Sequence, residues 1–218
     1  SGFASTAEYS FGHFFMNSAI VTVIGVVCTI FSFLLAAYAV SRVKFFGANF
    51  WFGCIIMTMM MPAQVMVVPQ YIILKKLHLN DTLLAMILPW AFGGAFFVFL
   101  IVQYMRGIPK ELDEAAMIDG CNKGKAMWHV VIPLMRSSFV QCIFLSTTRC
   151  FMVYDLNLSL TKGEPFNQSV LAAMHVYNQA FVYKNYGTGQ AEALVLFIVC
   201  AVIGMLQVYF GKKGEVAA

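Results

Sequence analysis

Residues 109–133, PKELDEAAMIDGCNKGKAMWHVVIP, form a polar segment that has long apolar runs on both sides. Pro109 suits the first turn of a helix, because the N–H that proline lacks has no partner there, and acidic residues follow it near the positive end of the helix dipole. Gly120 supplies a stop signal for this helix, and a second short helix is expected over about 122–131. The segment predicts two short surface helices that separate membrane spans.

The composition is that of a membrane protein. Of the 218 residues, 61% are hydrophobic and only 11% are charged, and the mean hydropathy is +0.78. A chain with so little polar surface cannot coat a water-soluble globule, so we expect an all-α, polytopic protein embedded in a lipid bilayer. A single transmembrane domain covering 1–218 follows. The net charge of +4 is modest and does not indicate a nucleic-acid partner.

Several apolar runs approach or exceed the roughly 20 residues that a helix needs to cross a bilayer. The second predicted span contains Pro62 and Pro69, which remove backbone donors and commonly kink a membrane helix. The third contains Pro89 and the pair Gly93-Gly94, where small residues permit close helix contacts. About five spans are predicted, over residues 14–40, 50–74, 82–104, 134–160 and 191–210.

The basic residues predict the orientation. Nine of the fourteen Lys and Arg residues fall in three places: the turn after the first span, the segment 106–136, and the tail at Lys212 and Lys213. The positive-inside rule places this side in the cytoplasm, and with it the loop 105–133 and the C-terminus. The stretch 161–190 and the N-terminus then lie outside, so we expect a sixth span upstream that is missing here. Lys75 and Lys76 fall on the outer side against the rule.

The polar segment has two interpretations on physical grounds alone. It could dock a partner, because Ala115 and Ala116 offer a smooth helix face, or it could rest on lipid headgroups as an amphipathic helix. Its acidic first turn disfavours an anionic leaflet, but this argument does not decide between the two.

The same residues carry a family resemblance. Glu114-Ala115-Ala116, then Ile118-Asp119-Gly120, and after a gap Ile132-Pro133-Leu134 resemble the EAA signature of permease subunits in bacterial binding-protein-dependent ABC importers. Ile132 stands where the family usually has Leu. The resemblance extends over nearly the whole chain, through NSAIVT (17–22), AAYAVSR (36–42) and MPAQVMVVPQY (61–71), and is closest to the carbohydrate-uptake, maltose-permease-like branch.

This resemblance implies a type I ABC importer permease fold in a bacterial inner membrane. It also implies four partners besides lipid: two ATP-binding cassette subunits, a second and different permease subunit, and an extracytoplasmic solute-binding protein. The chain has no GxxxxGK[ST] phosphate loop, so we expect it to bind neither ATP nor another cofactor and not to be an enzyme. The residues expected to couple it to the ATPase are Glu114, Ala115, Ala116, Asp119, Gly120 and Pro133.

Polar and aromatic residues in and near the spans are candidates for the solute path. Arg149 is expected in the outer half of the bilayer, because it lies about 24 Å along a helix from Pro133. It could pair with Glu192 or favour an anionic solute, and for every candidate the alternative is a hydrogen bond within the bundle. The candidates are Gln64, Gln70, Arg149, Phe151, Tyr154, Asp155 and Asn157.

The outer stretch contains one more predicted helix. Val170, Met174, Tyr177 and Phe181 recur at helical spacing within 167–181, which indicates an amphipathic helix. It could receive the solute-binding protein or simply cap the bundle.

Other classes of function have less support. The four histidines are dispersed without an HExxH motif, which disfavours a membrane-embedded enzyme, and no TVGYG filter indicates an ion channel. The six cysteines form no CxxC pair of the kind that holds zinc. The leading hypothesis is therefore a permease for a sugar or a related polar solute, with a permease for a non-sugar solute as the alternative.

Overall fold

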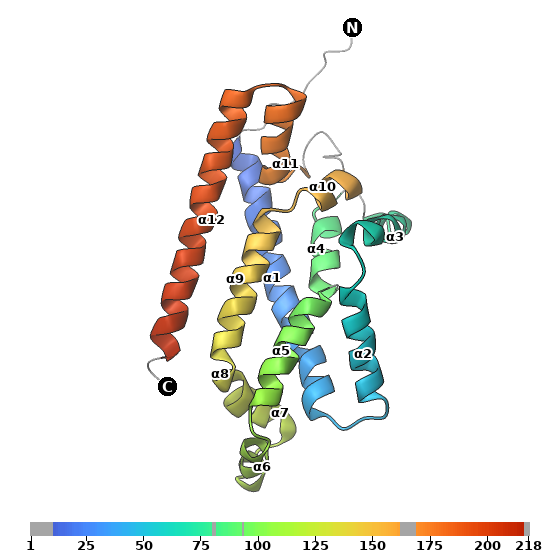
Figure 1. Ribbon diagram of the computed structural model, residues 1–218, viewed down its shortest axis with the longest axis vertical. Helices are drawn as coiled ribbons and strands as arrows, with labels where there is room; N and C mark the ends of the chain where they lie inside the picture. Colours follow the sequence, from blue (N-terminus) through green and yellow to red (C-terminus); the bar gives the residue numbers. More distant parts are fainter. Residues whose placement is uncertain (1–10, 80–81, 93, 162–168, 216–218) are drawn as a thin grey trace.

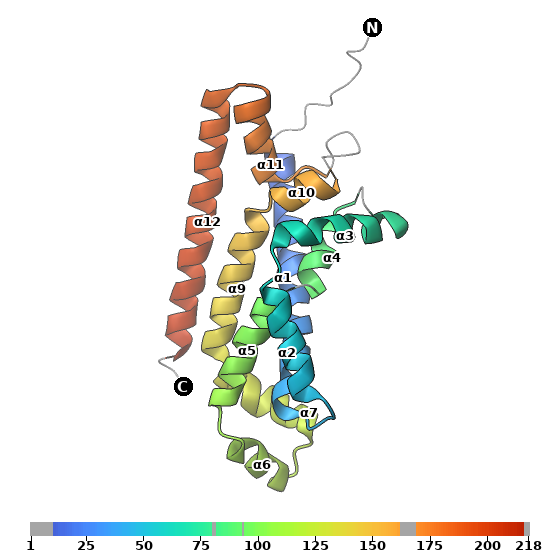
Figure 2. The same ribbon diagram turned by 45° about the vertical axis from the view of Figure 1, so that its right-hand side comes forward.

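The computed structural model describes residues 11–79, 82–92, 94–161 and 169–215, and every regular element in these ranges is helical. Figures 1 and 2 show an elongated bundle whose longest helices are α1 (Phe11–Arg42) and α12 (Tyr186–Glu215). Three helical stretches are long and apolar enough to cross a membrane, and the number rises to five if each of two bent helix pairs is one span. The predicted all-α architecture with about five spans is confirmed.

The second predicted span is a sharply bent pair of helices. Helix α2 (Ala48–Met59) ends before Pro62, and α3 (Ala63–Lys76) leaves it at 106°. Figure 2 shows α3 running across the bundle while α2 runs along it. The break occurs at Pro62 because proline confines the residue before it to extended conformations. Pro69 lies inside α3 without ending it. The interruption predicted for the span over 50–74 is thus confirmed at Pro62 but not at Pro69.

The third span consists of two consecutive helices. Helix α4 (Leu84–Phe92) and α5 (Ala95–Gly107) are separated by the glycine pair predicted to allow close contacts. Gly94 lies so close to α1 that a Cβ atom on it would be 2.6 Å from the ring of Phe33. The Thr29 hydroxyl of α1 donates a hydrogen bond of 3.1 Å to the Trp90 carbonyl in the last turn of α4, and so satisfies a backbone group near the break.

The polar segment is a chain of short helices. Helix α6 (Glu111–Ile118) is followed by α7 (Lys123–Ala126), the π-helical turn η1 (Met127–Val131) and α8 (Ile132–Leu134). Two helices at the predicted positions, α6 and the run 123–131, are thus present.

Helix α9 (Arg136–Phe151) corrects the fourth predicted span. It leaves the preceding helices at 76°, so the crossing begins at Arg136 and not at Leu134. It ends at Phe151, and a separate helix, α10 (Asp155–Leu160), follows. The span is therefore shorter at both ends than the predicted 134–160, because the apolar run turns twice.

The predicted outer helix is present in part. Helix α11 (Ala172–Tyr177) continues as the π-helical turn η2 (Asn178–Val182), whereas residues 162–168 lie outside the described part of the chain. Helix α12 begins at Tyr186, so the polar stretch is shorter than the predicted 161–190. In Figures 1 and 2, α11 lies beside the first turns of α12, at the end of the bundle opposite α6.

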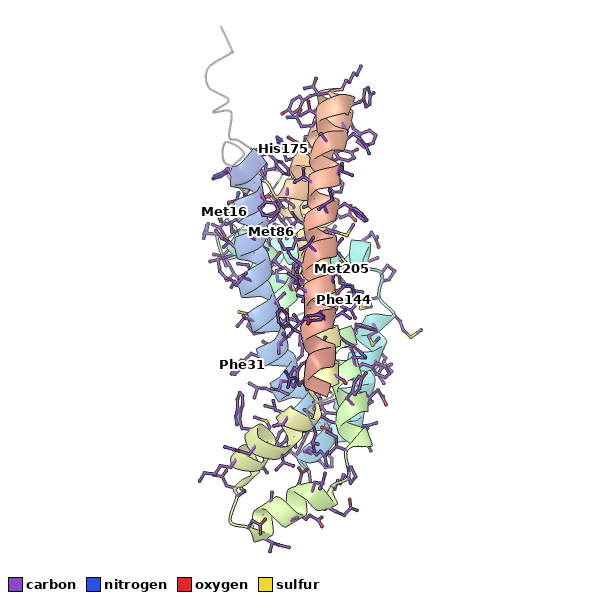
Figure 3. All side chains as sticks on the ribbon, turned by 90° about the vertical axis from the view of Figure 1, so that its left-hand side faces the viewer. Met16, Phe31, Met86, Phe144, His175 and Met205 are labelled. Carbon is purple, nitrogen blue, oxygen red and sulfur yellow. The ribbon has the colours of Figure 1, made fainter. Side chains whose placement is uncertain are left out.

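The core forms around α1, which packs against α4, α5, α9 and α11. Phe33 of α1 stacks on Phe97 of α5 with ring centroids 5.7 Å apart, and both rings are buried. The outward faces are apolar as well. Figure 3 shows the face formed by α1 and α12, where Met16, Phe31 and Met205 are 59%, 56% and 65% exposed. Exposed apolar surface of this extent is typical of a helix that faces lipid.

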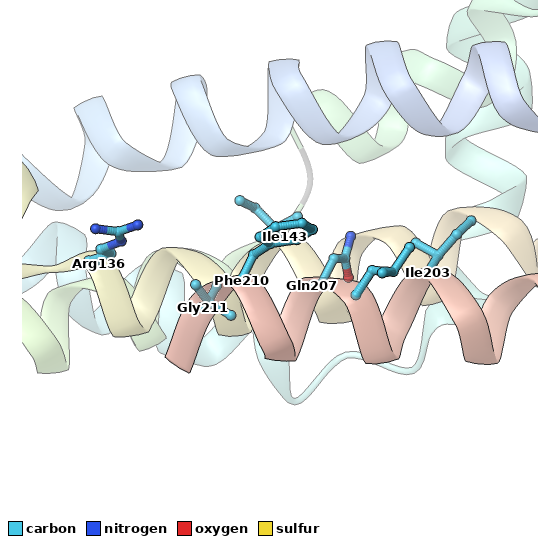
Figure 4. A pocket seen from close by; sticks show the side chains of 8 residues that line it. Arg136, Ile143, Ile203, Gln207, Phe210 and Gly211 are labelled. Atoms are coloured by element: carbon cyan, nitrogen blue, oxygen red, sulfur yellow. The ribbon is translucent and has the colours of Figure 1, made fainter. Parts of the chain in front are cut away.

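Helix α12 packs closely on α9 through glycines. A Cβ atom on Gly204 would lie 2.9 Å from the ring of Phe144, and one on Gly211 would lie 2.6 Å from Cγ1 of Val140. An open groove of about 390 Å³ runs beside this contact between the two helices, and Figure 4 shows its lining, with Arg136 at one end. Small residues permit this close packing, which association of helices in lipid relies on.

We predict that Gly211→Ala destabilises the protein by about 1–3 kcal/mol, because the added methyl group overpacks against the stiff side chain of Val140. Thermal unfolding in detergent measures the effect. Gly187→Ala in the same helix is the matched control, since nothing lies within 4 Å of a Cβ atom there. Equal stability of the two variants would contradict the packing described.

Candidate functional site

Helix α6 lies at one tip of the molecule, beyond the ends of α1 and α5 (Figures 1 and 2). Its C-terminus has the geometry of a Schellman motif. The N–H of Gly120 donates to the Met117 carbonyl at 3.1 Å, and the N–H of Cys121 donates to the Ala116 carbonyl at 2.9 Å. Gly120 has a φ of +89°, which glycine adopts without strain. The predicted helix stop at Gly120 is confirmed.

The predicted coupling residues divide into exposed and buried positions. Ala116 is buried, in a helix that packs against α7 and η1, whereas Glu114, Ala115, Asp119 and Gly120 are exposed. The apolar side chains beside them are exposed as well: Leu112 is 42%, Met117 41% and Ile118 86% accessible. A short helix with apolar side chains pointing outward and an acidic first turn is a suitable surface for a partner protein. Pro133 is exposed in α8, close to the bend into α9.

Arg42, the last residue of α1, joins α6 to the bundle. Its Nη2 donates hydrogen bonds to two backbone carbonyls at the end of α5, Met105 at 2.8 Å and Ile108 at 2.9 Å. Its Nη1 lies 3.0 Å from Oδ2 of Asp113 in α6. The two side chains are only 5% and 14% exposed, so water weakens the ion pair little. One guanidinium therefore contacts three helices.

The sequence analysis used Arg42 only as one of the basic residues that predict the orientation in the membrane, and assigned it no contact. Two features of the sequence could have pointed to its role: Arg42 is the last residue of the motif AAYAVSR, and the first turn of α6 is acidic. The pairing itself was not predictable, because 71 positions separate Arg42 from Asp113. The cation also lies beyond the last turn of α5, where carbonyl groups lack helical partners and the helix dipole is negative. Arg42 is thus positioned by ordinary helix-end electrostatics.

Two candidates for the solute path lie in the interior. Phe151 is 5% exposed and packs against Phe15, with ring centroids 5.8 Å apart. Asn157 is fully buried and its side chain is satisfied: Nδ2 donates to Ser169 and Thr161 at 2.9 Å, and Oδ1 accepts from the Leu171 N–H at 3.0 Å. In this conformation both hold the protein together and neither faces an open path.

The remaining candidates near α10 and α3 are more accessible. Tyr154 is half-buried and its ring lies 4.5 Å from that of Tyr177, while Asp155 is exposed at the start of α10. Burial, a hydrogen bond with Tyr177 and the nearby charge of Asp155 raise the pKa of Tyr154, so its phenol stays protonated at neutral pH. Gln64 is exposed and Gln70 is half-buried, both on α3.

Arg149 is exposed in the last turn of α9. Its guanidinium carbon lies 5.6 Å from the ring centroid of Phe96 and 5.8 Å from that of Phe97, both in the first turn of α5. The pairing with Glu192 that the sequence left open is absent among the described residues. Glu192 instead contacts His175, with Oε1 3.4 Å from Nε2.

Polar residues of α1 hold the opposite end of the bundle. Asn17 donates its amide to the Val170 carbonyl at 3.1 Å, and the Ser18 hydroxyl accepts from the Ala172 N–H at 2.9 Å. His175 of α11 stacks on Phe14 with centroids 4.3 Å apart; Figure 3 labels this histidine. The motif NSAIVT thus connects α1 to α11. In the part of the chain that the structure describes, no three His, Cys, Asp or Glu side chains gather as a metal site would require.

Comparison with known proteins identifies the family. The family of binding-protein-dependent transport system inner membrane components matches residues 28–214. The chain belongs to this family. With the spans described above, it is a multi-pass inner-membrane protein, and the EAA-like segment and the α6 tip both lie within the matched region.

Individual relatives agree with this family. A probable starch degradation products transport system permease protein of Thermoanaerobacterium thermosulfurigenes is 35% identical over 61% of this chain and 45% of its own length. A multiple sugar-binding transport system permease protein of Streptococcus mutans is 33% identical over 57% and 43%, respectively. The aligned part thus spans less than half the length of these two relatives.

A solved structure shares the fold. It is a bacterial alginate ABC transporter in complex with its alginate pentasaccharide-bound periplasmic protein, and it superposes with a TM-score of 0.78 over 95% of this chain and 80% of the other. The sequence identity of 12% means that this likeness bears on the fold alone.

We predict that Asp113→Asn loosens α6, because the nearly buried guanidinium of Arg42 then loses its counter-charge. Hydrogen exchange of residues 111–118 is expected to quicken, and the free energy of unfolding to fall by about 1–3 kcal/mol. The matched control is Glu111→Gln in the same turn, whose side chain is exposed. Unchanged exchange in the Asp113 variant would show that the ion pair does not hold α6.

Proposed function

We propose that this chain is one permease subunit of an ABC importer, which forms part of the translocation path for a sugar or related polar solute. Separate ATPase subunits supply the energy, and a solute-binding protein delivers the solute. The observation that carries the proposal is the tip at α6: an exposed, partly apolar helix joined through Arg42 to two bundle helices. A partner that moves α6 also moves α1 and α5.

The orientation follows from the same tip. It holds Arg42, Arg106 and the basic residues of α7, so the positive-inside rule supports a cytoplasmic location for the segment 105–133 and for the end of α12. The α11 end then faces outward, where a solute-binding protein arrives. Residues 161–190 would receive it there.

In this proposal α6 is the coupling helix. Glu114, Ala115, Asp119 and Gly120 contact the ATPase subunit directly, Ala116 is buried in the helix that packs against α7 and η1, and Pro133 lies near the bend that passes the movement to α9. A second, different permease subunit completes the path, and each permease docks one of two ATPases. Binding of ATP and of solute shifts the assembly between inward-open and outward-open states, because each ligand interacts differently with the two states.

A carbohydrate is the proposed solute because the named relatives handle starch degradation products and multiple sugars. A non-sugar solute is the alternative, and uptake assays decide between them. The path itself would use the accessible candidates Gln64, Gln70, Arg149, Tyr154 and Asp155. Phe151 and Asn157 would enter it only if the segment around α10 rearranged, since both are buried here.

We predict that Gly120→Ala abolishes sugar uptake at normal membrane levels of the protein. Space is available for the methyl group, but a φ of +89° strains alanine by about 1–2 kcal/mol, so the end of α6 changes shape. Radiolabelled oligosaccharide uptake by cells that express the whole transporter is the measurement.

Gly53→Ala in α2 controls for the substitution itself, since a Cβ atom there meets nothing within 4 Å and the backbone is helical. This variant is expected to transport normally. If the Gly120 variant also transported at the wild-type rate, α6 would not be the coupling helix.

A further inference from the structure

Arg149 lies in the last turn of α9, within a bent pair of helices that can form one membrane span. The next residue, Cys150, is close to Gly25 of α1: a Cβ atom on Gly25 would be 3.5 Å from its sulfur. Phe151 packs against Phe15, nearer the N-terminal end of α1. Arg149 is therefore level with the N-terminal half of α1, and its expected position in the outer half of the bilayer stays a prediction.

Contacts with α12 place Arg149 along that helix as well. Thr147 accepts a hydrogen bond of 3.1 Å from Gln207, and Phe144 lies against Gly204. Because the two helices run in opposite directions, Arg149 is level with the middle of α12, an apolar helix long enough to cross a membrane.

No negative group neutralises Arg149 within the described part of the chain. Its guanidinium lies over the rings of Phe96 and Phe97, and the carboxylate of Glu192 contacts His175 instead. Those two rings belong to the first turn of α5, where the helix dipole is positive and adds to the imbalance. The cation is exposed and stabilised by aromatic faces alone.

A polar contact lies further along the line where α5 and α9 meet. Two turns before Arg149 on α9, the exposed side chain of Gln141 accepts a hydrogen bond of 3.0 Å from Tyr104 of α5. We call Tyr104, Gln141 and Arg149, along the line where α5 and α9 meet, the polar seam; the two helices lie side by side in Figures 1 and 2. By contrast, exposed residues in the middle of α12 are apolar, as Leu194, Phe197, Val202 and Met205 illustrate.

Charged groups within spans face the bundle interior or a water-filled cavity, and they mark solute paths. We propose that Arg149 binds an anionic oxygen group of the transported solute, so that the solute is an acidic sugar carrying a carboxylate or a phosphate. This inference rests on the proposed function as a sugar permease and adds the charge of the solute to it.

The chemistry of the side chain fits such a ligand. A guanidinium offers a planar fork of N–H donors that matches a carboxylate or phosphate, and the pairing strengthens away from bulk water. The rings of Phe96 and Phe97 contact the cation without neutralising it and leave the solute to supply the missing charge. Gln141 and Tyr104, lower on the seam, present hydrogen-bonding groups of the kind that hydroxyl-rich sugars require. A neutral sugar would leave the cation unpaired.

The test is uptake of three labelled probes by cells that express the complete transporter: trigalacturonate, glycerol 3-phosphate and maltotriose. The wild-type protein is expected to carry at least one acidic probe in preference to maltotriose. Arg149→Gln is expected to lower uptake of that probe at least tenfold, mainly through a higher KM, and Arg149→Lys to recover part of it. Which acidic probe is carried distinguishes a carboxylate from a phosphate.

The control is Lys75→Gln, which removes another exposed cation that lies over an aromatic ring, Tyr71, on α3. It is expected to leave the preference for acidic probes unchanged. Uptake is normalised to the amount of assembled transporter in the membrane, so that a folding defect is not mistaken for lost binding.

Several outcomes would overturn the inference. Transport of maltotriose alone by the wild-type protein would refute an acidic solute while the sugar permease stands, and wild-type uptake of the acidic probe by Arg149→Gln would do the same. Loss of assembly in both Arg149 variants would also overturn it, because Arg149 would then be needed for the structure of the transporter and not for the solute. Transport of none of the probes would refute the proposed function itself.

Discussion

Arg42 occupies the one position where the last turn of α1, the carbonyl end of α5 and the first turn of α6 meet. Its guanidinium makes two hydrogen bonds to α5 and an ion pair to Asp113, and it is almost completely shielded from water. Nε and Nη1 of Arg42 have no hydrogen-bond partner in the described part of the chain, so the charge of Asp113 and the two carbonyls are what stabilise this cation where α1, α5 and α6 meet. The tip of the molecule is thereby linked to the bundle, as the coupling role proposed for α6 requires.

Elsewhere the bundle depends on interruptions of its helices. Pro62 turns α3 across the bundle, the glycine pair divides α4 from α5, and the bend before Arg136 swings α9 into the membrane. Backbone groups near these breaks need partners in lipid, and Thr29 provides one for Trp90. The same breaks bring the first turn of α5 beside Arg149, so the irregular parts of the fold form the surface on which the proposed solute contact lies.

Much of the fold was predictable from local pattern, and much less of the candidate site. The stop at Gly120 and the break at Pro62 were predictable because each depends on the backbone geometry of one residue. The roles of Asn157 and Phe151 were not predictable from local pattern. Whether such a side chain faces a solute path or the interior depends on segments elsewhere in the chain, here Ser169, Leu171 and Phe15. For the same reason Glu192 could not be assigned to His175 in advance.

The sequence by itself determined that this is a helical membrane protein, where its chain is interrupted, and which segment resembles a family signature, because hydrophobicity, turn chemistry and motif spacing are local properties. Only the tertiary structure decided that Arg42 holds α6, that the crossing over 134–160 is shorter than its apolar run, and that Arg149 meets aromatic rings and no carboxylate among the described residues. Those features arise from contacts between residues far apart in the chain. Bends of 76° and 106° change the direction of the helices, so the distance between two residues cannot be calculated from their separation in the sequence.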